Sequence, residues 1–151
     1  MELDLTWDYV ADDVMGGVSR GRITHQVIAG RNAARLTGDV SLDNDGGFIQ
    51  IASDLPGAGG FAGFALDLIG NGEAYDLRLR TTDLTRPWQS YRTEVIAGAD
   101  WTTHLIAFAD LVPHRTDAPF DPARLRRIGI VAVGRAFHAD VAVAGVRFWR
   151  D

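Results

Sequence analysis

The residue types that carry out chemistry occur in this sequence without the spacing that most reactions need. There is no cysteine, which excludes a thiol nucleophile and thiolate metal ligands. No serine lies in a G-x-S-x-G elbow, so a hydrolase triad has no anchor. The histidines lack the H-x-x-x-H or H-x-H spacing of a metal site; they are His25, His104, His114 and His138. We therefore expect no catalytic residues, no cofactor and no metal site among them.

Two segments imitate ligand-binding loops, and each fails at one point. Gly57–Ala62 fits the dinucleotide pattern G-x-G-x-x-G/A by letters, but the phosphate site needs a helix next, and Phe64–Leu68 alternates as a strand. Ser41–Gly46 begins like a calcium loop, but Ala52 stands where the final bidentate glutamate belongs. The chemistry of a hairpin turn explains Asp43–Gly46 better. A calcium site of another geometry stays open.

Charge and hydropathy limit the partners and the location. The chain has 15 basic residues, all of them arginine, against 20 acidic ones, and its net charge of -5 repels phosphate backbones. Nucleic acid is therefore excluded as a main partner. No apolar run approaches the ~20 residues that cross a bilayer, and the N-terminal residues lack the basic and apolar regions of a secretory signal. We expect a cytoplasmic protein without a transmembrane segment.

Short alternating apolar runs separated by turn residues predict an all-β fold. A length of 151 residues without a linker or a repeat fits one domain, residues 1–151. We predict a jelly-roll β-sandwich with about nine strands, and at most one short helical turn with Pro122 at its first position and Asp121 as its cap. The predicted strands are Arg22–Ile28, Ala33–Leu42, Phe48–Ala52, Phe64–Ile69, Tyr75–Thr81, Ser90–Ile96, Thr102–Phe108, Arg127–Val133 and Phe137–Phe148, the last broken at Gly145.

Two segments are more specific than a generic β protein. Asp12–Gly21 reads DDVMGGVSRG, and Leu36–Ile51 reads LTGDVSLDNDGGFIQI. Together they resemble the complex I intermediate-associated protein 30 family. The matching positions are Met15, Gly16, Gly17, Ser19, Gly21, Gly38, Val40, Ser41, Leu42, Asn44, Gly46, Gly47 and Phe48. The resemblance implies a galactose-binding-like sandwich. Because the mitochondrial members assist the assembly of respiratory complex I, it also implies a protein partner, such as a respiratory-complex subunit or intermediate.

The same segments have a physical interpretation and one departure from the family. The motif positions Met15, Gly16, Gly17, Ser19, Asn44, Gly46, Gly47 and Phe48 are expected to form shaped turns, where glycine allows a positive φ or a close approach of the backbone. After that turn the family commonly has an arginine, but this chain reads Ile49-Gln50-Ile51-Ala52. A groove that uses this arginine in other members is therefore altered here.

Alternation within strands predicts a polar binding face. Along Tyr75–Thr81, one side of the strand is apolar and the other side is charged, and Ser90–Ile96 alternates in the same way. We expect these charged sides to combine with nearby aromatic residues into a surface that binds a partner or ligand. Its predicted residues are Gln50, Asp76, Arg78, Arg80, Trp88, Tyr91, Arg92, Glu94 and His104.

The sequence therefore predicts a non-enzymatic binding or assembly factor that contacts a protein. A carbohydrate-binding module with a polar groove on one sheet is the alternative, because sandwiches of this kind commonly bind sugars. A hydrolase is a third possibility, since some pair of carboxylates is always available among the acidic residues. The fold decides none of these functions by itself.

Overall fold

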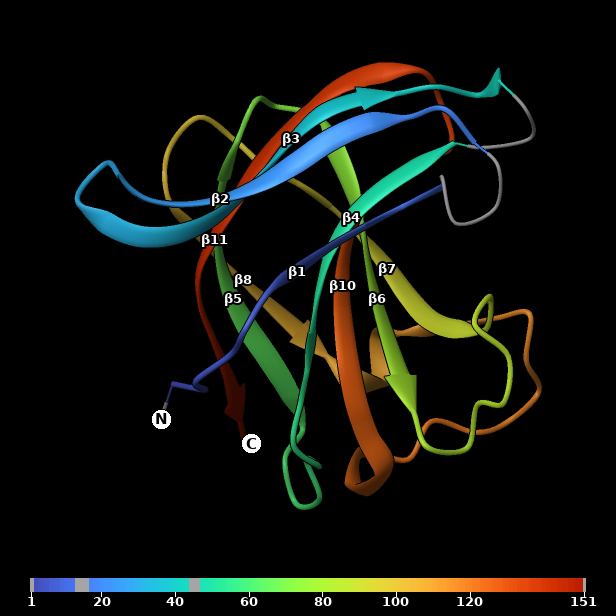
Figure 1. Cartoon of the computed structure of the whole chain (residues 1–151). Coiled ribbons are helices and arrows are strands. Elements are labelled where there is room, and N and C mark those ends of the chain that lie inside the picture. Colours follow the sequence, from blue (N-terminus) through green and yellow to red (C-terminus); the bar gives the residue numbers. More distant parts are fainter. Residues whose placement is uncertain (1, 13–16, 44–46, 151) are drawn as a thin grey trace.

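The computed structural model describes residues 2–12, 17–43 and 47–150, which form eleven strands in two antiparallel sheets (Figure 1). The strands are β1 (Asp8–Ala11), β2 (Arg20–Ile28), β3 (Arg31–Val40), β4 (Phe48–Asp54), β5 (Gly63–Gly70), β6 (Ala74–Thr81), β7 (Ser90–Ile96), β8 (Thr102–Ala107), β9 (Val112–His114), β10 (Leu125–Val133) and β11 (Phe137–Trp149). The short helical turns η3 (Phe108–Asp110) and η4 (Pro122–Arg124) complete the elements. No helix in these described ranges is long and apolar enough to cross a membrane.

The connections between strands give the fold its jelly-roll character. One sheet has six strands in the order β1-β4-β10-β6-β7-β9, and the other has five in the order β2-β3-β11-β5-β8. The pairs β2–β3 and β6–β7 are hairpins within a sheet, whereas most other connections pass from one sheet to the other. The predicted all-β jelly-roll sandwich is therefore confirmed. The predicted hairpin at Asp43–Gly46 is wrong, because β3 and β4 belong to different sheets.

The core lies between the two sheets and follows directly from the alternation. Leu66 of β5, Leu77 of β6 and Ile130 of β10 are fully buried, and their sequence neighbours point outward. Burying one such side chain contributes about 1.5–3 kcal/mol, so the inward-facing positions supply most of the stabilisation. The same alternation fixes which side chains remain on the two outer faces.

All nine predicted strands exist, with ends that differ by a few residues. The two strands that the sequence did not reveal, β1 and β9, are the edges of the six-stranded sheet. They are short, and β9 contains Pro113, which an edge strand tolerates because its N–H side needs no partner. The predicted helical turn is confirmed as η4, where the Asp121 side chain accepts a hydrogen bond from the Ala123 N–H. The predicted break at Gly145 is a bulge in β11.

A buried carboxylate explains the described part of the two sequence motifs. Asp12 accepts hydrogen bonds from Ser19 Oγ at 2.5 Å and from the Gly47 N–H at 2.7 Å. Burial works to raise the pKa of Asp12, but these bonds and one from the Phe48 N–H outweigh it and lower the pKa. A Cβ on Gly17 would collide with this carboxylate, and Gly47 has a φ of 142°.

Asp12 therefore ties the turn before β2 to the turn before β4, and the two motifs act as one structural unit. The remaining predicted turn positions, Met15, Gly16, Asn44 and Gly46, lie outside the described residues.

Candidate binding site

The outer face of the six-stranded sheet carries the charged side chains that alternation predicted. We call it the arginine face and define it by Asp76, Arg78 and Arg80 of β6 and Arg92 and Glu94 of β7. Their neighbours along each strand point into the core, so these five side chains point away from it. The strand register sets Arg78 opposite Arg92 and Asp76 opposite Glu94. Arg80 and Arg92 thus share one face, as the alternation predicted.

Asp76 forms ion pairs with two of the three arginines. Its carboxylate lies 2.6 Å from Arg92 Nη2 and 3.0 Å from Arg78 Nη2, and 5% of its side chain is exposed. Burial acts to raise the pKa of Asp76, but the hydrogen bonds from Arg92 and Arg78 lower it below the usual value. The Asp76 side chain is therefore ionised at neutral pH, and its two oxygens are occupied by guanidinium groups.

Arg80 has no carboxylate partner within the described part of the chain. Its Nη1 donates to the backbone carbonyl of Pro87 at 3.0 Å, and its buried Nε has no hydrogen-bond partner there. Burial lowers the pKa of Arg80, and repulsion from Arg126 and Arg127 lowers it further. A half-buried cation held among other cations is unfavourable without an anion, so this position favours an external anionic partner.

Two further predicted residues lie on or beside the arginine face. Gln50 of β4 points outward between buried Ile49 and Ile51. Its Oε1 lies against Gly129, so close that a Cβ added to this glycine would be 2.6 Å from the oxygen. Trp88 follows Pro87 in the loop between β6 and β7 and is 55% exposed. Its position next to the Arg80 contact places a large aromatic surface at the margin of the face.

Two predicted site residues lie elsewhere. Tyr91 is fully buried, where its hydroxyl donates to the Ala118 carbonyl at 2.8 Å and its ring packs edge-on against Phe120. It belongs to the core because it is out of phase with Arg92, and a ligand on the outer face cannot reach it. His104 lies in β8 of the other sheet, opposite Leu66 and on the core-facing side. The prediction that it joins the charged patch is therefore wrong.

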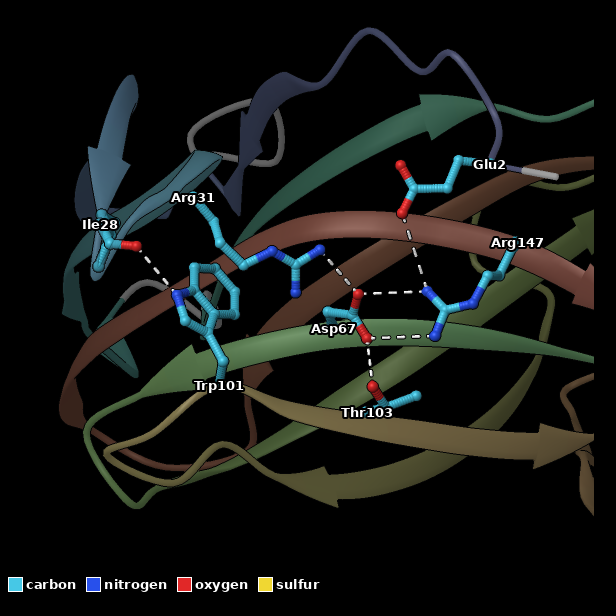
Figure 2. Close-up of polar contacts among 7 residues, drawn as sticks. All are labelled: Glu2, Ile28, Arg31, Asp67, Trp101, Thr103 and Arg147. Atoms are coloured by element: carbon cyan, nitrogen blue, oxygen red, sulfur yellow. Dashed lines mark hydrogen bonds and ion pairs between the residues drawn. The ribbon is translucent and has the colours of Figure 1, made fainter.

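A second charged cluster, which the sequence reasoning missed, lies on the outer face of the five-stranded sheet. Figure 2 shows Asp67 of β5 at its centre, with Arg31 Nη2 at 2.9 Å, Arg147 Nη1 at 3.2 Å and Thr103 Oγ1 at 2.5 Å. Glu2 lies 4.0 Å from Arg147. We call these five residues the Asp67 cluster. Burial acts to raise the pKa of Asp67, but the bonds from Thr103, Arg147 and Arg31 lower it.

Local features of β5 and β11 make room for this cluster. Asp67 interrupts the apolar run of β5, and its position on the outer face follows from the core positions of Leu66 and Leu68. The bulge in β11 sets Gly145 opposite Asp67, where a Cβ would lie 2.7 Å from Glu2 Oε1. The only hint of this cluster in the sequence was a single aspartate within an apolar strand. Its partners could not be predicted, because they are distant in sequence.

The same face is hollowed beside the Asp67 cluster. The indole N–H of Trp101, which precedes β8, donates to the carbonyl of Ile28 at the end of β2 with a distance of 2.9 Å. Since β2 and β8 are the two edges of this sheet, this single bond links the end of one edge strand to the residue before the other (Figure 2). A hollow of about 300 Å³ adjoins them, and Arg35, bonded to Asp140 at 2.6 Å, is part of its lining.

Two antiparallel sheets with crossing connections define a jelly-roll β-sandwich. The chain belongs to the Complex I intermediate-associated protein 30 (CIA30) family, whose model matches residues 2–140. Among curated protein sequences there is no match.

Solved structures share the fold at low sequence identity. The family 11 carbohydrate-binding module of the cellulase Lic26A-Cel5E of Clostridium thermocellum superposes with a TM-score of 0.80 at 10% identity, over 98% of this chain and 89% of that chain. A family 11 module from the same organism, in complex with a β-1,3-1,4-mixed-linked tetrasaccharide, gives 0.79 at 12% identity, over 99% and 94%. The family 30 module of its cellulase Cel9D-Cel44B gives 0.60 at 14%, over 89% and 92%.

Proposed function

We propose that this chain is a non-enzymatic binding module that contacts a protein partner through the arginine face. The observation that carries the proposal is the charge of this face, where Asp76 is shared by Arg78 and Arg92 and Arg80 has no carboxylate partner among the described residues. The chain as a whole is acidic, so a locally cationic face selects for acidic partners by electrostatic complementarity.

Exposed apolar side chains beside the arginines support a protein as the partner. Ile96, at the end of β7, and Val112 of β9 point to the same side as Arg92, and both are largely exposed. Together with Trp88 they give the mixture of arginine, aromatic and aliphatic groups that is enriched in protein interfaces.

Membership in the family suggests which proteins to test. The name of the family refers to intermediates of respiratory complex I, and we propose a complex I subunit or assembly intermediate as the partner. The binding residues in this proposal are Gln50, Asp76, Arg78, Arg80, Trp88, Arg92 and Glu94.

Affinity capture from extracts of the native host tests this function. The parent chain, the double variant Arg80→Ala/Arg92→Ala and the control Arg22→Ala, an exposed arginine of β2 in the other sheet, are compared by quantitative mass spectrometry. We expect the parent and the control to enrich the same complex I proteins, and the double variant to lose about tenfold or more of that enrichment. Melting temperatures within a few degrees establish that all three fold. Full retention by the double variant contradicts the proposal.

A carbohydrate-binding module is the second candidate, and the hollow on the five-stranded sheet favours it. Charged pairs and an indole line or adjoin this hollow, and such groups commonly contact sugars. A glycan array with the parent and with Trp101→Ala separates the two candidates. Specific glycan binding that Trp101→Ala removes, together with failure of protein capture, favours the carbohydrate function.

A further inference from the structure

Two neighbouring polar atoms on the arginine face have no hydrogen-bond partner in the described chain. They are Arg80 Nε and Ser90 Oγ, and both are shielded from water. Ser90 is 4% exposed, so its hydroxyl has given up its hydrogen bonds to water without gaining one from the protein. A buried polar group in this condition is unfavourable, and a partner that supplies the missing bond would relieve the cost.

The hairpin β6–β7 brings the two residues together. The ladder between β6 and β7 ends at the pair Leu79–Tyr91, and Arg80 and Ser90 are the residues that flank this last pair, one on each strand. Both side chains point to the outer face, because Leu79 and Tyr91 are buried in the core. Two other buried polar atoms without a partner, His104 Nε2 and Trp149 Nε1, belong to separate positions of the five-stranded sheet. Arg80 and Ser90 are therefore a pair, and the other two are isolated.

The free edge of the Arg80 guanidinium has the geometry of a carboxylate site. Nη1 is occupied by the Pro87 carbonyl, which leaves Nε and Nη2 as a parallel pair of donors. Two parallel N–H groups bind the two oxygens of a carboxylate in a bidentate manner, and the adjacent Ser90 hydroxyl can add a third donor. Such a site would have all its donors directed at one anion.

The charges around this pair also select for an anion. Arg126 and Arg127 repel Arg80, and the nearby carboxylate of Asp54 is bonded to Arg127 at 2.9 Å. On the other side of Ser90, the register places His114 of β9. Burial lowers the pKa of His114, and repulsion from Arg78, Arg115 and Arg92 adds to it although Asp76 opposes it. The histidine therefore stays neutral at pH 7 and supplies a further hydrogen-bonding group rather than a counter-charge.

We propose that Arg80 and Ser90 form an anchor for one carboxylate of the partner protein, either an acidic side chain or a chain terminus. The proposal rests on the proposed function for its biological ligand, but the anchor itself can be tested without that partner. In binding, the carboxylate accepts from Arg80 Nε and Nη2 and from Ser90 Oγ, while Nη1 keeps its bond to the Pro87 carbonyl.

Sodium acetate is a minimal probe of this anchor. The Nε–Hε signals of the arginines are followed by NMR during titration with acetate, against sodium chloride at equal ionic strength. We expect a saturable shift of the Arg80 signal, no such shift for the control Arg22, and a loss of affinity of about tenfold in Ser90→Ala. Ser90→Ala removes a hydroxyl that has no partner, so it should fold like the parent, and melting temperatures verify this. Arg80→Lys keeps the charge but lacks the fork and has no Nε–Hε signal, so it is followed by the backbone amide signal of Ser90, which should shift with acetate in the parent but not in Arg80→Lys.

The outcomes separate this anchor from the proposed function. If the parent captures its protein but acetate never shifts Arg80, the anchor is overturned and the function stands. If acetate binds as expected but no protein is captured, the anchor stands and the function is overturned. A saturable response to inorganic phosphate without one to acetate overturns the carboxylate assignment. An acetate response unchanged in Ser90→Ala overturns the role of Ser90.

Discussion

Asp67 and Asp76 are each buried between two arginines on the outward face of a sheet, but the two arrangements differ in reach. The partners of Asp67 come from the start of β3, from β11 and from β8, so one carboxylate ties together strands across the five-stranded sheet. The partners of Asp76 are Arg78, two residues further along the same strand, and Arg92 on the adjacent strand. The Asp67 cluster therefore holds several strands of the five-stranded sheet together, whereas the ion pairs of Asp76 only fix side chains on the β6–β7 hairpin.

The two clusters also differ in charge balance. In the Asp67 cluster two arginines face two carboxylates, Asp67 and Glu2, and each charge has a partner. On the arginine face three arginines face Asp76 and Glu94, and Arg80 is left with a backbone carbonyl. A saturated cluster contributes to the stability of the fold. A cluster in which one arginine lacks a carboxylate partner keeps donors for an external group, and for this reason we assign binding to the arginine face.

The largest expected effect on the free energy of unfolding follows from removing the charge of Asp67. Asp67→Asn leaves Arg31 and Arg147 without their shared carboxylate, and we expect a loss of about 3 kcal/mol in the free energy of unfolding. The matched variant Asp76→Asn should lose less, because its partners lie on its own strand and on the adjacent strand, so that no link between distant strands is removed. Urea unfolding at pH 7 measures both. Equal losses, or a larger loss for Asp76→Asn, would contradict the distinction between a stabilising Asp67 cluster and a binding arginine face.

The acid dependence of stability should be smaller than the effect of the substitution but should follow from the same carboxylate. The pKa of Asp67 is lowered in the folded state, so the charged form stabilises the fold, and this contribution is complete above the usual carboxyl pKa of 3.8. It is lost as the pH falls through the lower folded value. The gap in stability between the parent and Asp67→Asn should therefore be constant from about pH 5 to 8 and narrow below about pH 4. Urea midpoints across this range test the prediction, and a gap that stays unchanged in acid would argue against it.

Alternation was sufficient to predict the arginine face, since it depends on neighbours along one strand. Arg80 is out of phase with Leu79, and Arg92 is out of phase with Tyr91, so both had to point away from the core. The same reasoning placed Tyr91 on the apolar side. Its inclusion in the site rested on its closeness in sequence to Arg92 and Trp88, and burial of the ring excludes it.

The sequence could not show which strands lie side by side. His104 was expected on the outer, polar side of its strand, but in β8 it faces the core side and Leu105 is exposed. The chain also crosses to the other sheet between β7 and β8, and no local signal marks that crossing. The Asp67 cluster was missed for the same reason, because Arg31 and Arg147 lie 36 and 80 residues away from Asp67. Turn residues are likewise ambiguous. Asp43 and Gly47 have hairpin chemistry, yet they belong to a crossover that Asp12 holds in place.

The smallest effect concerns the indole that joins the two edges of the five-stranded sheet. Trp101→Phe removes the N–H that donates to the Ile28 carbonyl and weakens the contact with the Arg31 guanidinium, which lies 5.3 Å from the ring centroid. One neutral hydrogen bond contributes about 1 kcal/mol, and we expect a loss of this size in urea unfolding. Trp88→Phe is the matched control from the arginine face: its indole is exposed and carries no structural bond in the described chain, so stability should be unchanged. If Trp88→Phe destabilised the fold as much as Trp101→Phe, the loop beside Arg80 would contribute to stability, as the Asp67 cluster does. If Trp101→Phe left the free energy of unfolding unchanged, the bond between Trp101 and Ile28 would not contribute to holding the two edges of the five-stranded sheet together.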